Sequence, residues 1–156
     1  MKTIFTTMIV GAILVVGASA ALAADAAAGT WKLNLAKSTY SPGPAPKSQT
    51  RSYVESERGL TVTIKTVAAD GRESTATLTF KDDGKPYPSS GNPDYDMVSV
   101  MRVDPLTVHS TQMRAGKTVG AGVRTVSKDG KTLTFSQKLT DKSGVKHDDV
   151  AVYDRQ

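Results

Sequence analysis

Two arginines lie in segments that otherwise have the composition of apolar or glycine-rich strands. By strand alternation, Arg102 shares a face with Val98 and Val100, and Arg124 lies on the face of two glycines, which leave space beside it. An arginine enclosed by apolar side chains would pair with a carboxylate of the protein or of a ligand. The alternative for both is an ordinary position at the rim of the fold. Both arginines are candidate ligand-binding residues.

Three further side chains could line a binding site for an apolar or amphipathic molecule. Tyr53 alternates onto the face of Arg51 and Glu55. Met101 and Met113 could form a soft wall around a ligand, because thioether side chains adapt their shape. The alternative for the methionines is filling of a core. Tyr53, Met101 and Met113 therefore join the arginines as candidates.

The two histidines are His109 and His147, and only His109 is a candidate for a site. It could act as a haem ligand, as a general base or simply as a hydrogen-bonded strand residue, and no second histidine lies nearby in the sequence. His147 stands beside two aspartates at the expected start of a strand. The absence of cysteine excludes Cys-ligated zinc, iron–sulfur clusters and thiol catalysis. We assign no catalytic residue, no metal ligand and no cofactor.

Residues 1–23 have the pattern of a secretory signal peptide. Lys2 precedes an apolar run from Ile4 to Val16, and small residues including Ala21 and Ala23 follow before Asp25. The run is shorter than the roughly 20 residues that span a bilayer, so a membrane anchor is the weaker interpretation. We expect a periplasmic or secreted domain of residues 24–156, with no membrane span after removal of the signal.

The charge of the chain argues against nucleic acid as a partner. The formal net charge of +5 becomes +4 without Lys2, and the remaining lysines and arginines are scattered singly at turns and strand ends. A nucleic-acid surface would need a basic stripe interleaved with aromatic side chains. The positive charge is therefore interpreted as a contribution to solubility. The sequence does not indicate an oligomeric state.

The elements that must position these side chains are short strands. Asp-Gly and related turn pairs recur at regular intervals, and the segments between them alternate apolar and polar residues. We expect ten strands, at about 29–34, 48–56, 60–68, 72–80, 85–88, 96–103, 106–114, 117–127, 131–140 and 145–154. Proline-rich residues 38–46 and residues 87–96 interrupt the pattern and are expected to form ordered loops.

A series of consecutive hairpins favours an all-β fold, an antiparallel up-and-down β-barrel of about 8–10 strands. Closure removes exposed strand edges, which a chain without disulfides needs. The strand pattern alone also permits a two-sheet β-sandwich, which stays as the alternative.

The segment Gly29-Thr30-Trp31 resembles the Gly-x-Trp signature on the first strand of lipocalins and the wider calycin superfamily. With its later Pro-rich and Lys-Asp-Gly-Lys segments, the chain is similar to small secreted lipocalin-like proteins of bacteria. The resemblance implies that Gly29 and Trp31 are structural residues at one closed end of the barrel.

The chain departs from the fatty-acid-binding members of that superfamily in two ways. A proline-rich segment replaces the two helices after the first strand. Those members hold a carboxylate with Arg-x-Tyr on the last strand, whereas here Arg51-Ser52-Tyr53 lies on the second. We therefore do not carry over their carboxylate site or their mode of ligand entry.

The sequence thus predicts a non-enzymatic, exported protein that holds a small apolar or amphipathic ligand inside the barrel. Two alternatives remain open. One is an envelope structural or interaction protein whose barrel is filled by its own side chains. The other is a haem-binding or enzymatic barrel that uses His109, with Arg102 or Arg124 as an electrostatic partner.

Overall fold

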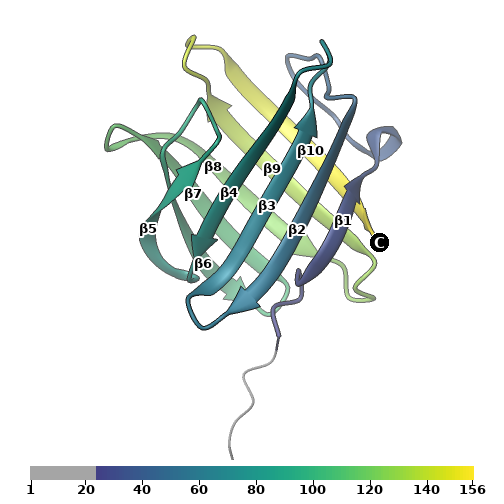
Figure 1. The fold of residues 1–156 in the computed structure, drawn as a ribbon, viewed down its shortest axis with the longest axis vertical. Coiled ribbons are helices and arrows are strands. Elements are labelled where there is room, and N and C mark those ends of the chain that lie inside the picture. Colours follow the sequence, from purple (N-terminus) through teal and green to yellow (C-terminus); the bar gives the residue numbers. More distant parts are fainter. Residues whose placement is uncertain (1–23) are drawn as a thin grey trace, which may run out of the picture.

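The computed structural model describes residues 24–156, which form a closed barrel of antiparallel strands (Figure 1). The strands are β1 (Gly29–Leu33), β2 (Ser48–Ser56), β3 (Gly59–Val67), β4 (Glu73–Phe80), β5 (Asp83–Ser90), β6 (Met97–Asp104), β7 (Thr107–Arg114), β8 (Lys117–Val126), β9 (Thr132–Thr140) and β10 (Lys146–Arg155). They follow one another in chain order, and β1 closes the barrel by pairing with both β2 and β10. The expected barrel is confirmed, and the sandwich alternative is wrong. The expected signal peptide lies outside the described residues.

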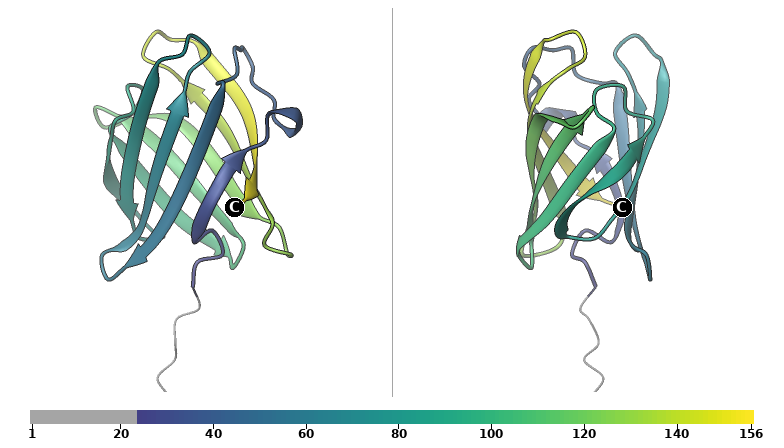
Figure 2. Two further views of the ribbon diagram at one scale, coloured as in Figure 1. Left: turned by 45° about the vertical axis from the view of Figure 1, so that its right-hand side comes forward. Right: turned by 90° about the vertical axis from the view of Figure 1, so that its left-hand side faces the viewer.

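The two ends of the barrel are used below as landmarks. The lower end carries residues 24–28, and the upper end carries the turn between β9 and β10 (Figure 1). Figure 2 shows the strands tilted across the barrel axis, with connecting turns at both ends. A tilt of this kind is what closure of a twisted sheet requires.

Strand β5 is the one element whose bounds differ from the expected bounds by more than one residue. It runs from Asp83 to Ser90, so residues 87–90 belong to a strand and not to the loop expected over residues 87–96. Proline has no N–H to donate to a neighbouring strand. Pairing of β5 with β4 is limited to two positions, near its end at Ser90, and a register shift interrupts its pairing with β6. The prolines are tolerated because β5 is only weakly paired.

Alternation places one face of each strand inside the barrel. Tyr53, Val62, Leu78 and Val98 are buried side chains of four different strands. Burial of apolar side chains from every side of a closed sheet is the main source of stability, at about 25 cal/mol per Å² of apolar surface. The core therefore occupies the barrel interior.

The proline-rich segment forms an ordered strap against β10, as expected. A short 3-10 helix, η1 (Leu35–Lys37), leads into it, and Thr39 N donates to Val150 O at 2.8 Å. Ser41 N donates to the Asp149 carboxylate at 3.0 Å. No helix within residues 24–156 has the length and apolar character needed to cross a bilayer.

Candidate functional site

The barrel interior contains a small cavity of about 70 Å³. Its apolar walls come from Val62, Ile64, Leu78, Phe80, Val98, Val100, Val108 and Phe135. Its polar lining consists of Arg51, Tyr53, Tyr95, Ser110, Gln112 and Arg124. Six polar side chains around so small an apolar space favour a site that recognises a polar group.

Arg124 projects from β8 into this interior. Its side chain is 5% exposed, and its Nη2 donates to both carboxylate oxygens of Asp25 at 3.0 and 3.1 Å. Its guanidinium carbon lies 5.1 Å from the centre of the Tyr53 ring, a cation–π contact. Its Nε and Nη1 are buried and have no hydrogen-bond partner among the described residues. The N–H groups of Nε and Nη1 are thus available to a ligand.

Gln112, on β7, is a second buried polar group in the interior. Its side chain is 2% exposed, and its Nε2 donates to Ser110 Oγ at 3.0 Å. Its Oε1 has no partner among the described residues. Because buried polar atoms are nearly always hydrogen-bonded, the Gln112 and Arg124 atoms without partners mark a place where a polar molecule would be stabilised.

Arg51, on β2, lies between two aromatic rings. Its guanidinium carbon is 4.4 Å from the centre of the Phe135 ring and 5.1 Å from that of Tyr153. Its Nε donates to the Tyr153 hydroxyl at 3.0 Å, and that hydroxyl donates to Gln49. Burial raises the pKa of Tyr153 although Arg51 opposes the change, so the phenol stays neutral. Arg51 forms no ion pair with a carboxylate of residues 24–156.

Two glycines of β8 make room for these interior side chains. A Cβ on Gly122 would lie 2.8 Å from Phe135 Cζ. One on Gly120 would lie 2.7 Å from Lys138 O and 3.0 Å from Gln112 Oε1. Real Cβ atoms essentially never approach other atoms within 3.0 Å. The space expected beside Arg124 is therefore filled by Phe135 and Gln112.

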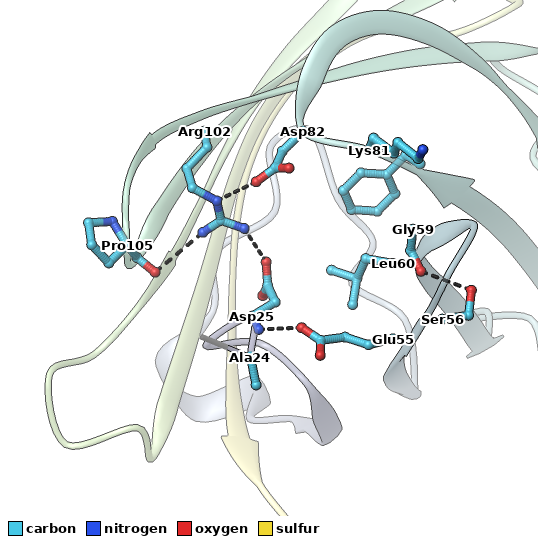
Figure 3. A pocket seen from close by; sticks show the side chains of 11 residues that line it. Ala24, Asp25, Glu55, Ser56, Gly59, Leu60, Lys81, Asp82, Arg102 and Pro105 are labelled. Atoms are coloured by element: carbon cyan, nitrogen blue, oxygen red, sulfur yellow. Dashed lines mark hydrogen bonds and ion pairs between the residues drawn. The ribbon is translucent and has the colours of Figure 1, made fainter. Parts of the chain in front are cut away.

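Arg102 lies at the lower rim, half-exposed, rather than inside the cavity. It donates to Asp25 and to Asp82 (Figure 3). Both carboxylates that pair with Arg102 belong to the protein itself. Arg102 therefore occupies a position at the rim of the fold, which was the alternative to a position inside the cavity. Burial tends to raise the pKa of Asp25, but Arg124, Arg102 and the Ala27 N–H together lower it, so Asp25 is held as a carboxylate.

The lower end also contains a larger pocket, of about 600 Å³ (Figure 3). Leu60, Phe80 and Pro105 provide apolar surface in it. Asp25 and Arg102 line it as well, so the ion pairs of the lower rim face this space. Phe80 borders both this pocket and the interior cavity.

Met101 and His109 lie on the outer face of the barrel, and Met113 is half-buried. None of the three lines the interior cavity, so the expectation that they line it is corrected. Val100 and Arg102 define the inward positions of β6, so Met101 points outward and is 57% exposed. His109 pairs with Met101 across the sheet and is also exposed. Because His109 faces away from Arg102 and Arg124, neither arginine is placed to serve as its electrostatic partner.

Gly29 and Trp31 lie at the lower end of the barrel. Trp31 is completely buried, its Nε1 donates to Ala27 O at 2.7 Å, and Arg155 covers its ring at 4.1 Å from the centroid. Gly29 has a positive φ of 121°, and a Cβ there would lie 2.8 Å from Arg155 Nη1. Both residues therefore shape this end of the barrel.

Sequence reasoning missed Gln112, Asp25 and the role of Arg51. Arg51 shares its inward face with Tyr53, and that alternation was a usable signal. Asp25 precedes the first strand, where no strand pattern applies.

No group of three or more His, Asp or Glu side chains that could hold a metal ion occurs in residues 24–156.

No family model matches the chain, and no curated protein matches it. Among solved structures, the chain is similar to the zebrafish ileal bile acid-binding protein in complex with cholic acid. The TM-score is 0.48 and the sequence identity is 11%, over 84% of this chain and 99% of the other.

Proposed function

We propose that this protein is a non-enzymatic binding protein that holds a small organic anion in the barrel interior, with the acid group against Arg51 and Arg124. The observation that carries the proposal is the excess of positive charge around the cavity. Two guanidinium groups line it, and one carboxylate, that of Asp25, reaches one of them. A bound carboxylate would supply the missing negative charge.

The energetics favour an anion over a neutral ligand. A guanidinium taken out of water is costly unless it is paired, and a carboxylate is the group that its fork of N–H donors fits best. Arg124 offers Nε and Nη1 without partners, and charge-assisted hydrogen bonds are about twice as strong as neutral ones. The aromatic rings of Tyr53, Phe135 and Tyr153 hold both guanidinium groups in place.

The volume of the interior cavity limits the size of the ligand group that can bind in it. A water molecule occupies about 30 Å³ in the liquid, so about 70 Å³ accommodates an acid group with few carbon atoms. The interior thus suits a compact carboxylate or the head group of an amphipathic acid.

Titration calorimetry with sodium propionate, and with neutral propionamide of the same shape, tests this function. We expect saturable propionate binding, no propionamide binding, and a loss of at least about tenfold in affinity for Arg51→Gln. Arg72→Gln is the matched control, since Arg72 is 85% exposed and pairs with Asp70 on the surface. Equal binding of the two probes, or propionate affinity unchanged by Arg51→Gln, would contradict the proposal.

The filled-barrel alternative is also supported by a specific observation, namely the small cavity volume. In that case the protein would act through its outer surface as a structural or interaction protein. The same titration separates the two functions, because a filled barrel binds neither probe.

We also infer export to the periplasm or the exterior. The inference is supported by the signal-peptide pattern of residues 1–23 and by Ala27 and Trp31, which tie residues 25–28 into the barrel directly after the expected cleavage site. Cell fractionation followed by intact-mass measurement tests it. A cytoplasmic protein that retains Met1 to Ala23 would contradict it.

A further inference from the structure

Residues Asp25–Ala28, which we call the N-terminal plug, cross the lower end of the barrel ahead of β1. The plug is held by five side chains of the barrel, those of Trp31, Glu55, Arg102, Arg124 and Arg155. Arg155 donates to Ala26 O and Ala28 O, each at 2.7 Å, and Trp31 donates to Ala27 O. The carboxylate of Asp25 reaches inward to Arg124. The plug is therefore held by hydrogen bonds to its backbone and by the two ion pairs of Asp25, with Arg124 and with Arg102.

The plug lies between two spaces of different size. Arg124, which Asp25 contacts, lines the interior cavity of about 70 Å³, and Asp25 itself lines the lower pocket of about 600 Å³. Phe80 borders both. The Asp25 carboxylate thus links a residue of the interior cavity to the lower pocket. The lower pocket alone falls in the roughly 300–1,000 Å³ range of small-molecule sites.

If an anion takes the place of the Asp25 carboxylate, that carboxylate can move away and both Arg102 and Arg124 still have a negatively charged partner. Arg102 has two carboxylate partners, Asp25 and Asp82, so it keeps one when Asp25 moves. Arg124 has Asp25 alone among the described residues. An incoming carboxylate on Arg124 restores its pairing, and the released Asp25 gains hydration.

We propose that the ligand is an amphipathic monocarboxylic acid with an aliphatic tail, and that its carboxylate displaces Asp25 from Arg124. The tail then lies in the lower pocket, along Leu60, Phe80 and Pro105. This inference rests on the proposed anion-binding function and adds the class of ligand and its route. Asp25 acts as an internal competitor for Arg124 until an acid with a tail binds.

Trp31 provides a direct readout, since it is the single tryptophan of the chain and donates to the plug. Titration of the purified full chain with decanoate is expected to give tighter binding than propionate and to move Trp31 emission to longer wavelength. Asp25→Asn removes the competitor and is expected to strengthen decanoate binding about tenfold, as when a closed state no longer competes. Asp70→Asn, at an exposed turn, is the matched control and leaves the affinity unchanged.

Arg102→Gln is a second variant that loosens the plug and leaves Asp25 on Arg124. It is also expected to strengthen decanoate binding, by a smaller factor. If propionate binds in an Arg51-dependent way but decanoate binds no tighter and Trp31 emission stays constant, the plug inference is wrong and the anion site stands. If neither acid binds the folded protein, both proposals fail.

Discussion

The Asp25 carboxylate, from a segment outside the barrel strands, pairs with the buried guanidinium of Arg124 on β8 through contacts of 3.0 and 3.1 Å. The two residues are 99 positions apart in the chain. Their side chains are 7% and 5% exposed, so water screens the pair little. The pair joins the lower end of the barrel to its interior.

Asp25 is expected to make stability depend on acid pH. Its pKa is lowered in the folded protein, so its contribution is present above the unfolded value of about 4 and is lost as pH falls through the folded value. Asp25→Asn lacks this contribution, and we expect it to cost up to about 3 kcal/mol at neutral pH. The neighbouring residues Glu55, Asp82, Arg102 and Arg124 are the same in both proteins, so the comparison isolates Asp25. Urea unfolding from pH 3 to 7 checks this, and a stability difference that stays constant with pH would contradict it.

Gly122→Ala is expected to disturb the interior through steric overlap. The added Cβ would lie 2.8 Å from Phe135 Cζ and 2.9 Å from Ser110 Oγ, so the Phe135 ring must move, at a cost of about 1–3 kcal/mol. Gly43→Ala is the control, because its nearest neighbour would lie 3.7 Å away. Chemical denaturation measures both. Equal stability of the two variants would show that the interior adapts freely.

The fold could be predicted from the sequence because its signals are local. Turn pairs such as Asp129-Gly130 mark the hairpins, and two-residue alternation marks the inner face of each strand. Closure followed from the number of consecutive hairpins. The loop expected over residues 87–96 was too long at its start, because β5 continues to Ser90 as a partly paired strand that tolerates proline.

The site could be predicted only in part, because its contacts join distant segments. Alternation correctly grouped Tyr53 with Arg51. The same alternation places the adjacent Met101 and Arg102 on opposite faces, which is why the two candidates could not both line one interior, although both were proposed. The partner of Arg124 could not be found, because Asp25 lies in a segment without periodicity that only the closed barrel brings to β8.

Arg155→Lys is expected to destabilise the lower end of the barrel. The Arg155 guanidinium donates to Ala26 O, Ala28 O and Gly130 O and covers the Trp31 ring. An ammonium group cannot reproduce this planar set of contacts, so we expect a loss of about 1–2 kcal/mol in unfolding free energy. Urea unfolding followed by Trp31 fluorescence measures it. Unchanged stability together with unchanged acrylamide quenching of Trp31 would contradict the structural role of Arg155.

His109→Ala is expected to leave the interior site unaffected, because the side chain lies on the outer face and is exposed. Its neighbours across the sheet, Met101 and Val123, are exposed as well, so truncation opens no cavity and should change stability by less than about 0.5 kcal/mol. Propionate titration of this variant beside Arg51→Gln provides the comparison. A loss of binding in His109→Ala as large as that in Arg51→Gln would mean that ligand is held on the outer face, and the interior site would then have to be abandoned.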